Sequence, residues 1–111
     1  MRYGGRLFRP VKTSGASQIG DDTIFKYEQI EDMVTATYSG GNIRFGQIIG
    51  RVDEDGVLDM RYQHMDRSGA LMTGHCKTTP EILPGGKLRL HESWRWTCGG
   101  CGEGQSILEE I

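Results

Sequence analysis

The stretch KLRLHESWRWT, residues 87–97, alternates apolar and polar side chains almost without interruption. A period of two is typical of a β-strand with one buried face. Glu92 falls in register with the apolar set of this strand, which is Leu88, Leu90, Trp94 and Trp96. A carboxyl group is therefore predicted to point into the interior, and Glu92 is the first candidate for a functional residue.

Turn sequences recur along the rest of the chain, as expected from its 17 glycines. The segments between these turns have strand length and strand-like alternation. Eight strands are predicted in all, over residues 6–13, 23–29, 32–39, 42–52, 57–65, 70–78, 87–97 and 105–111. Pro80 and Pro84 are expected to interrupt the connection after the strand at 70–78, outside the paired strands, because proline has no N–H to donate to a ladder. No segment of ten or more residues has helical periodicity.

The tight connections predict antiparallel neighbours, because a parallel crossover needs roughly a dozen or more linking residues. The expected fold is all-β, a single domain over residues 1–111 that forms an antiparallel up-and-down meander. Closing such a meander removes its exposed edges. We therefore expect a closed or nearly closed barrel, which is similar to the calycin barrels of lipocalins and streptavidin in strand count and alternation. A barrel of eight strands is filled by side chains or holds one small ligand.

Alternation also predicts which side chains face inward. In the fourth strand these are Ile43, Phe45, Gln47 and Ile49. The inward faces of strands 70–78 and 105–111 stay undecided, because residues on both faces of each strand compete for the interior. One bulge would invert the register of any strand. Several inward positions are polar or aromatic. The candidate ligand-binding residues are Tyr38, Gln47, Tyr62, His64, Glu92, Trp94 and Trp96.

Three interpretations of these polar positions remain open. In the first, Glu92 hydrogen-bonds either a tyrosine hydroxyl or His64, and the polar groups form a plug that closes the barrel. In the second, the same groups line a pocket with aromatic walls, in which a few polar groups orient a small ligand. A third interpretation is that His64 and Glu92 act together as a general acid and general base. The first two interpretations predict a raised pKa for Glu92 unless a cation lies beside it, because burial disfavours the charged form.

The composition narrows the range of partners. The net charge is -2, from 13 Lys and Arg against 15 Asp and Glu, which gives no general attraction to nucleic acid or anionic membranes. No apolar run approaches the roughly 18 residues of a membrane span, and no secretory signal is visible at the start. With three cysteines, an odd number, the chain is expected in the cytoplasm.

Cys98 and Cys101 form a CxxC in a glycine-rich loop, which is half of a zinc site or a redox pair. A structural zinc site needs four ligands, and the chain has no second CxxC. Incidental turn cysteines are the favoured interpretation, with metal or a reversible disulfide as alternatives. No cofactor and no catalytic residue are predicted.

Five segments resemble a group of short bacterial proteins that are often labelled N-acetylglutamate synthase: TIFKY (23–27), YSGG (38–41), GVLDMRY (56–62), PEIL (80–83) and LHESWRW (90–96). That label implies acetyl transfer from acetyl-CoA. The nearest match to an acetyl-CoA loop, QIIGRV at 47–52, lies inside a predicted strand rather than at a helix start, where such a loop binds phosphate.

We therefore expect a barrel that binds a small, partly apolar molecule. The alternatives are a filled structural or interaction protein, in which a homodimer is possible, and the acetyltransferase that the label implies.

Overall fold

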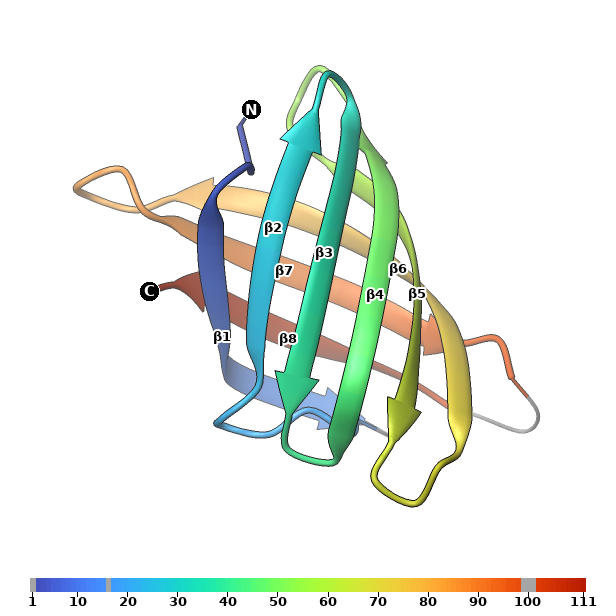
Figure 1. Cartoon of the computed structure of the whole chain (residues 1–111). Helices are drawn as coiled ribbons and strands as arrows, with labels where there is room; N and C mark the ends of the chain where they lie inside the picture. The colour runs from blue at the N-terminus through green and yellow to red at the C-terminus, as the bar shows by residue number, and fades with distance from the viewer. Residues whose placement is uncertain (1, 16, 99–101) are drawn as a thin grey trace.

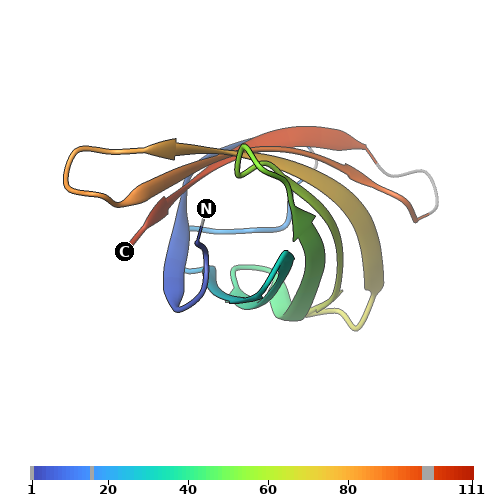
Figure 2. The same ribbon diagram turned by 90° about the horizontal axis from the view of Figure 1, so that it is seen from above.

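Eight strands form a closed barrel in the computed structural model, which describes residues 2–15, 17–98 and 102–111. They are β1 (Arg6–Gly15), β2 (Ile24–Ile30), β3 (Met33–Gly40), β4 (Ile43–Val52), β5 (Leu58–Asp66), β6 (Leu71–Ile82), β7 (Leu88–Trp96) and β8 (Glu103–Glu110). Each strand pairs antiparallel with the next, and β8 pairs with β1 (Figures 1 and 2). The predicted all-β meander barrel is confirmed. The described residues contain no helix long and apolar enough to cross a membrane.

The prediction that Pro80 lies outside the paired strands is wrong, because β6 continues to Ile82 with Pro80 opposite Leu90 of β7. The pairing of β6 with β5 stops at Thr78, which lies opposite Leu58. Beyond Thr78 the strand has a neighbour on one side only, so a residue without an N–H is tolerated there. The paired ends of β6 and β7 project from the barrel as a hairpin (Figures 1 and 2).

One end of the barrel is filled by packed side chains. Tyr3, Phe8 and Tyr27 are fully buried there, with ring centroids 6.1 Å apart for Tyr3 and Tyr27 and 5.0 Å apart for Phe8 and Tyr27. The Tyr3 hydroxyl donates to the carbonyl of Gly56, in the turn between β4 and β5, at 2.5 Å. Leu88 and Leu90 are buried as well. Tyr3, near the start of the chain, and the turn between β4 and β5 thus help to close this end. The burial of Leu88 and Leu90 agrees with the inward face that the alternation of residues 87–97 predicted.

A β-bulge in β4 overturns the predicted inward set of that strand. The pairing with β5 shifts by one residue between Ile43 and Phe45, and such a shift exchanges the two faces of a strand. Ile43 faces inward as predicted, but Gly46 and Ile48 are the next buried residues. Phe45, Gln47 and Ile49 lie on the outer surface, where Gln47 accepts a hydrogen bond from Gln63 at 3.2 Å. The prediction that Gln47 faces the interior is wrong.

The two undecided registers are resolved by burial. In β6 the inward residues are Gly74, Cys76 and Thr78, and in β8 they are Ser106 and Leu108. The interior therefore gains polar groups, from Thr78 and Ser106, that flank Glu92 in the sheet.

Candidate ligand-binding pocket

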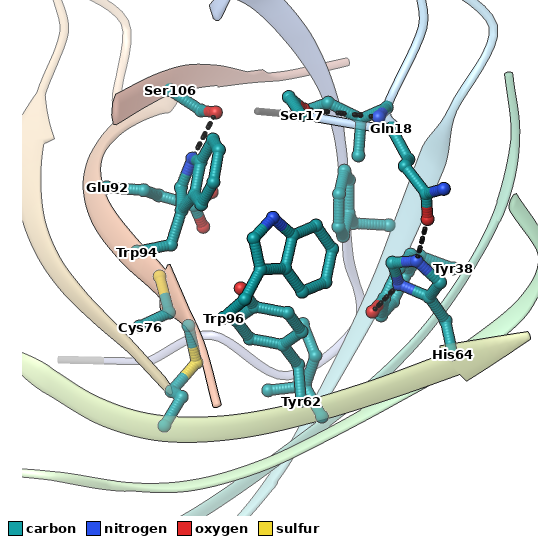
Figure 3. Close-up of a pocket in the computed structure, with 14 residues that line it drawn as sticks. Ser17, Gln18, Tyr38, Tyr62, His64, Cys76, Glu92, Trp94, Trp96 and Ser106 are labelled. Atoms are coloured by element: carbon teal, nitrogen blue, oxygen red, sulfur yellow. Dashed lines mark hydrogen bonds between the residues drawn. The ribbon is translucent and has the colours of Figure 1, made fainter. Parts of the chain in front are cut away.

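The end of the barrel opposite Tyr3 contains a pocket of about 60 Å³ (Figure 3). It lies towards the last residues of β3, β5 and β7, which carry Tyr38, His64 and Trp96. Six of the seven candidate residues line it, namely Tyr38, Tyr62, His64, Glu92, Trp94 and Trp96. Gln47 does not. Ser17, Gln18 and Ile19, from the connection between β1 and β2, complete one side, and Ser106 of β8 lies beside Trp94.

Three of the aromatic side chains owe their positions to glycines on the neighbouring strand. Each ring stands opposite a glycine in the sheet register, the pairs being Tyr38 with Gly46, Tyr62 with Gly74 and Trp94 with Gly104. A Cβ at these glycines would lie 2.2, 2.1 and 2.5 Å from atoms of the respective ring. The rings therefore lie directly over glycine backbone, in space that a side chain at these glycines would occupy.

The aromatic side chains form one continuous wall, which we define as Phe25, Tyr38, Tyr62, Trp94 and Trp96. Phe25 stacks on Tyr38 at 4.9 Å between centroids, and Trp96 lies edge-on to Tyr62 at 5.5 Å and to Trp94 at 5.9 Å. His64 connects the two parts, at 5.7 Å from Tyr38 and 5.4 Å from Trp96. Such edge and stacked contacts favour fixed ring positions.

A chain of hydrogen bonds runs from the pocket to the turn between β5 and β6. The Gln18 amide nitrogen donates to Asp66 at 2.9 Å, so the amide oxygen of Gln18 is left to accept from His64 Nε2 at 2.6 Å. His64 Nδ1 then accepts from the Tyr38 hydroxyl at 2.9 Å. This assignment needs a neutral imidazole, which burial supports by lowering the pKa of His64.

Asp66 anchors the chain. Its carboxylate accepts hydrogen bonds from the Ser68 hydroxyl, from Gln18 and from the backbone N–H of Ala70. These bonds, that of Ser68 first, lower the pKa of Asp66 to about 2. A fixed negative group therefore orients Gln18 and, through it, the tautomer of His64.

Tyr38→Phe is expected to lower the free energy of unfolding by roughly 1–3 kcal/mol, because buried His64 Nδ1 loses its donor while the ring packing stays. Chemical denaturation at pH 7 measures this loss. Tyr62→Phe is the matched control, since its hydroxyl donates to the Arg95 carbonyl at an exposed site. Equal losses in the two variants would show that the buried hydrogen-bond chain contributes nothing specific.

Glu92 lies on β7 between the filled end and the pocket, and only 9% of it is exposed. The hydrogen bond that the structure shows for its carboxyl group is donated by Thr78 at 3.4 Å. Burial raises the pKa of Glu92 to about 8, with Thr78 acting weakly in the opposite direction. The predicted rise is confirmed. The predicted bond between Glu92 and His64 is wrong, because both ring nitrogens of His64 are bound by Tyr38 and Gln18.

Trp94 is held beside Glu92 by polar contacts of its own. Its indole N–H donates to the Ser106 hydroxyl at 2.9 Å, and Ser106 shares a hydrogen bond with Thr13 at 2.8 Å. Figure 3 shows Glu92, Trp94 and Ser106 together on one side of the pocket, with the Tyr38 and His64 pair on the other. Lys and Arg are absent from the described residues that line the pocket.

The cysteines and the other histidines give no metal centre within the described part of the chain, where no three potential ligands cluster. Burial raises the pKa of the Cys76 thiol. Cys98 is half-buried, and Cys101 lies outside the described residues, so their role stays a prediction. His75 and His91 face outward, 2.7 Å from Asp59 and 2.8 Å from Glu81.

The comparisons with known proteins agree with this geometry. The model of a family described as avidin-like protein matches the chain over residues 1–111. Neither the search of curated proteins nor the search of solved structures gave a match. The N-acetylglutamate synthase label has no support in these comparisons.

Proposed function

This chain belongs to the avidin-like protein family, and on that premise we propose that it binds one small, partly apolar molecule in the open end of its barrel. The observation that carries the proposal is the pocket itself, a concave site walled by aromatic rings with a few oriented polar groups. That combination is typical of small-molecule sites.

The site is largely preformed. Three rings of the aromatic wall, those of Tyr38, Tyr62 and Trp94, lie over glycine backbone. The polar groups of Tyr38, His64 and Trp94 are already held by hydrogen bonds within the barrel. Side chains that are fixed before binding lose little rotamer entropy when a ligand enters, which favours affinity.

The size of the pocket limits the ligand. About 60 Å³ is several times what a single water needs, roughly 10–15 Å³. A compact head group therefore enters the barrel, and the remainder of a larger ligand lies at the mouth beside Ser17 and Gln18. Gln18 belongs to the hydrogen-bond chain and so connects the mouth to His64.

Tryptophan fluorescence tests the proposal, because the chain has two tryptophans and both line the pocket. We expect saturable quenching by at least one member of a panel of biotin, cyclic ureas, lactams, small amines and neutral alcohols. The same compound should raise the melting temperature, since binding to the folded state stabilises it. Gln47→Ala is the control, because this side chain lies on the outer surface and should leave the titration unchanged.

A panel in which no compound quenches or shifts the melting temperature would favour the filled scaffold instead. Acetyl transfer stays the alternative that the synthase label implies, and heat on mixing with acetyl-CoA would support it. The homodimer also stays a prediction. The observation that favours it is a set of exposed apolar side chains on the outer face of β4 and β6, which are Phe45, Ile49 and Leu71.

A further inference from the structure

Glu92 has a feature that simple apolar binding does not explain. A buried ionised carboxylate without a countercharge is costly, and proteins avoid it by pairing the group or by keeping it protonated. No Lys or Arg is found among the described pocket-lining residues, and Thr78 offers one long hydrogen bond. Among the described residues, the wall of the pocket therefore offers this acid no positively charged partner.

The aromatic wall faces the same space as this acid. Phe25, Tyr38, Tyr62, Trp94 and Trp96 all line the pocket together with Glu92. The faces of aromatic rings carry negative charge density, and groups of rings recognise organic ammonium ions. Trp94 follows Glu92 by two residues on the inward face of β7, so ring and carboxyl group are adjacent (Figure 3).

The other polar groups of the pocket do not oppose a cation. Burial keeps His64 neutral in the neutral pH range, and its hydrogen bonds fix both ring nitrogens. Ser17 and Ser106, which are uncharged, also line the pocket. The chain as a whole carries a net charge of -2.

We propose that the pocket recognises a small organic cation, whose ammonium group lies between the Glu92 carboxylate and the aromatic wall. This inference rests on the proposed function and specifies the class of its ligand. An entering cation replaces the proton of the Glu92 carboxyl group, and that proton passes to the solvent. The free energy spent on removing this proton therefore becomes smaller as the pH rises towards the pKa of Glu92, which is about 8 in the empty pocket.

The groups that face Glu92 from the other strands do not produce the same pH dependence. They are Tyr27 of β2, Tyr38 of β3, His64 of β5 and Cys76 of β6. The Tyr62 ring of β5 also lines the pocket. Burial raises the pKa values of Tyr27, Tyr38 and Cys76, and burial lowers that of His64. Between pH 7 and pH 9, Glu92 is thus the group expected to titrate.

Matched pairs of ligands test the inference. Choline and 3,3-dimethylbutan-1-ol have the same shape and differ in the charge of one atom, and cyclohexylamine and cyclohexanol form a second pair. We expect the cation of at least one pair to bind about tenfold or more tighter than its neutral partner at pH 9. Because choline has a fixed charge, its affinity should rise about tenfold between pH 7 and pH 9 as Glu92 loses its proton. Calorimetry in two buffers measures the released proton directly.

Glu92→Gln should remove both the preference for the cation and the rise with pH. Glu28→Gln is the matched control, since it removes the same charge from the exposed outer face of β2. Neutral partners that bind as tightly as the cations, or cations that fail while neutral compounds of the panel bind, would overturn the inference and leave the proposed function intact. A protein that binds neither pair and no compound of the panel would overturn both. The ratio of affinities in the unmodified protein decides the question even if Glu92→Gln folds poorly.

Discussion

Glu92→Gln is expected to become more stable than the unmodified protein as the pH rises, with the difference growing between about pH 4.5 and pH 8. Burial raises the pKa of Glu92 from its ordinary value of 4.5 to about 8 in the folded protein. The unfolded chain therefore releases this proton at a lower pH than the folded chain does. The contribution of Glu92 to the free energy of unfolding therefore falls by roughly 1 kcal/mol per pH unit across that window and levels off above it.

The comparison of the two proteins isolates Glu92 from all other titrating groups. At pH 4 the protonated carboxyl and the amide are similar in shape and charge, so both proteins should unfold at similar denaturant concentrations. At pH 8 the free energy of unfolding of the variant should exceed that of the unmodified protein by a few kcal/mol. A difference of this size gives a clear rise in melting temperature. Denaturant titrations at pH 4, 5, 6, 7 and 8 measure the difference.

Glu28→Gln again provides the control, because this acid is exposed and its substitution should shift stability little at any pH. Parallel stability curves for Glu92→Gln and the unmodified protein would mean that the carboxyl group is not desolvated in the empty barrel. A solvated Glu92 carboxylate would not need a positively charged ligand beside it. The same experiment therefore also tests the proposal that the ligand is a cation.

The alternating pattern of 87–97 was enough to predict β7, its two buried leucines and the inward position of Glu92, because every second residue of a paired strand must share a face. The same logic predicted the closed meander, since eight strands with short connections leave few other arrangements. It also placed six of the seven candidate residues on the pocket lining.

Gln47 shows where this logic fails. One inserted residue between Ile43 and Phe45 reverses every later side chain of β4, and the sequence contains no clear mark of the bulge. The sequence does place a glycine, Gly46, next to Gln47. Its position opposite Tyr38 is the signal that would have corrected the register, because a ring that lies inward needs room on the neighbouring strand.

Ser17 and Gln18 were missed for a different reason. They lie in the connection between β1 and β2, where no periodicity indicates which side chains point inward. Only the folded chain brings Gln18 between His64 and Asp66, which are distant from it in the sequence. The neutral state of His64 depends on the same burial and could not be inferred from its neighbours along β5.

Gly46→Ala is expected to lower the free energy of unfolding by roughly 1–3 kcal/mol and to abolish binding in the pocket. The added Cβ would lie 2.2 Å from Cζ of Tyr38 and 2.5 Å from both Cε atoms, so the ring must move. A displaced Tyr38 loses its hydrogen bond to His64 and its stacking on Phe25. The methyl group changes no charge and adds no polar atom, so any loss comes from displacement of the ring.

Gln47→Ala is the control for this variant, because it lies one residue further along the same strand and faces the outer surface. Its stability should change by no more than about 0.5 kcal/mol, and its ligand titration should match that of the unmodified protein. Denaturant titration and tryptophan quenching are measured on both variants. The reverse outcome, in which Gln47→Ala loses binding and Gly46→Ala keeps it, would contradict the bulged register of β4, because in the uninterrupted register Gln47 faces the pocket and Gly46 faces solvent. The pair of variants therefore tests, with two small substitutions, whether the Tyr38 ring needs a glycine opposite it on β4.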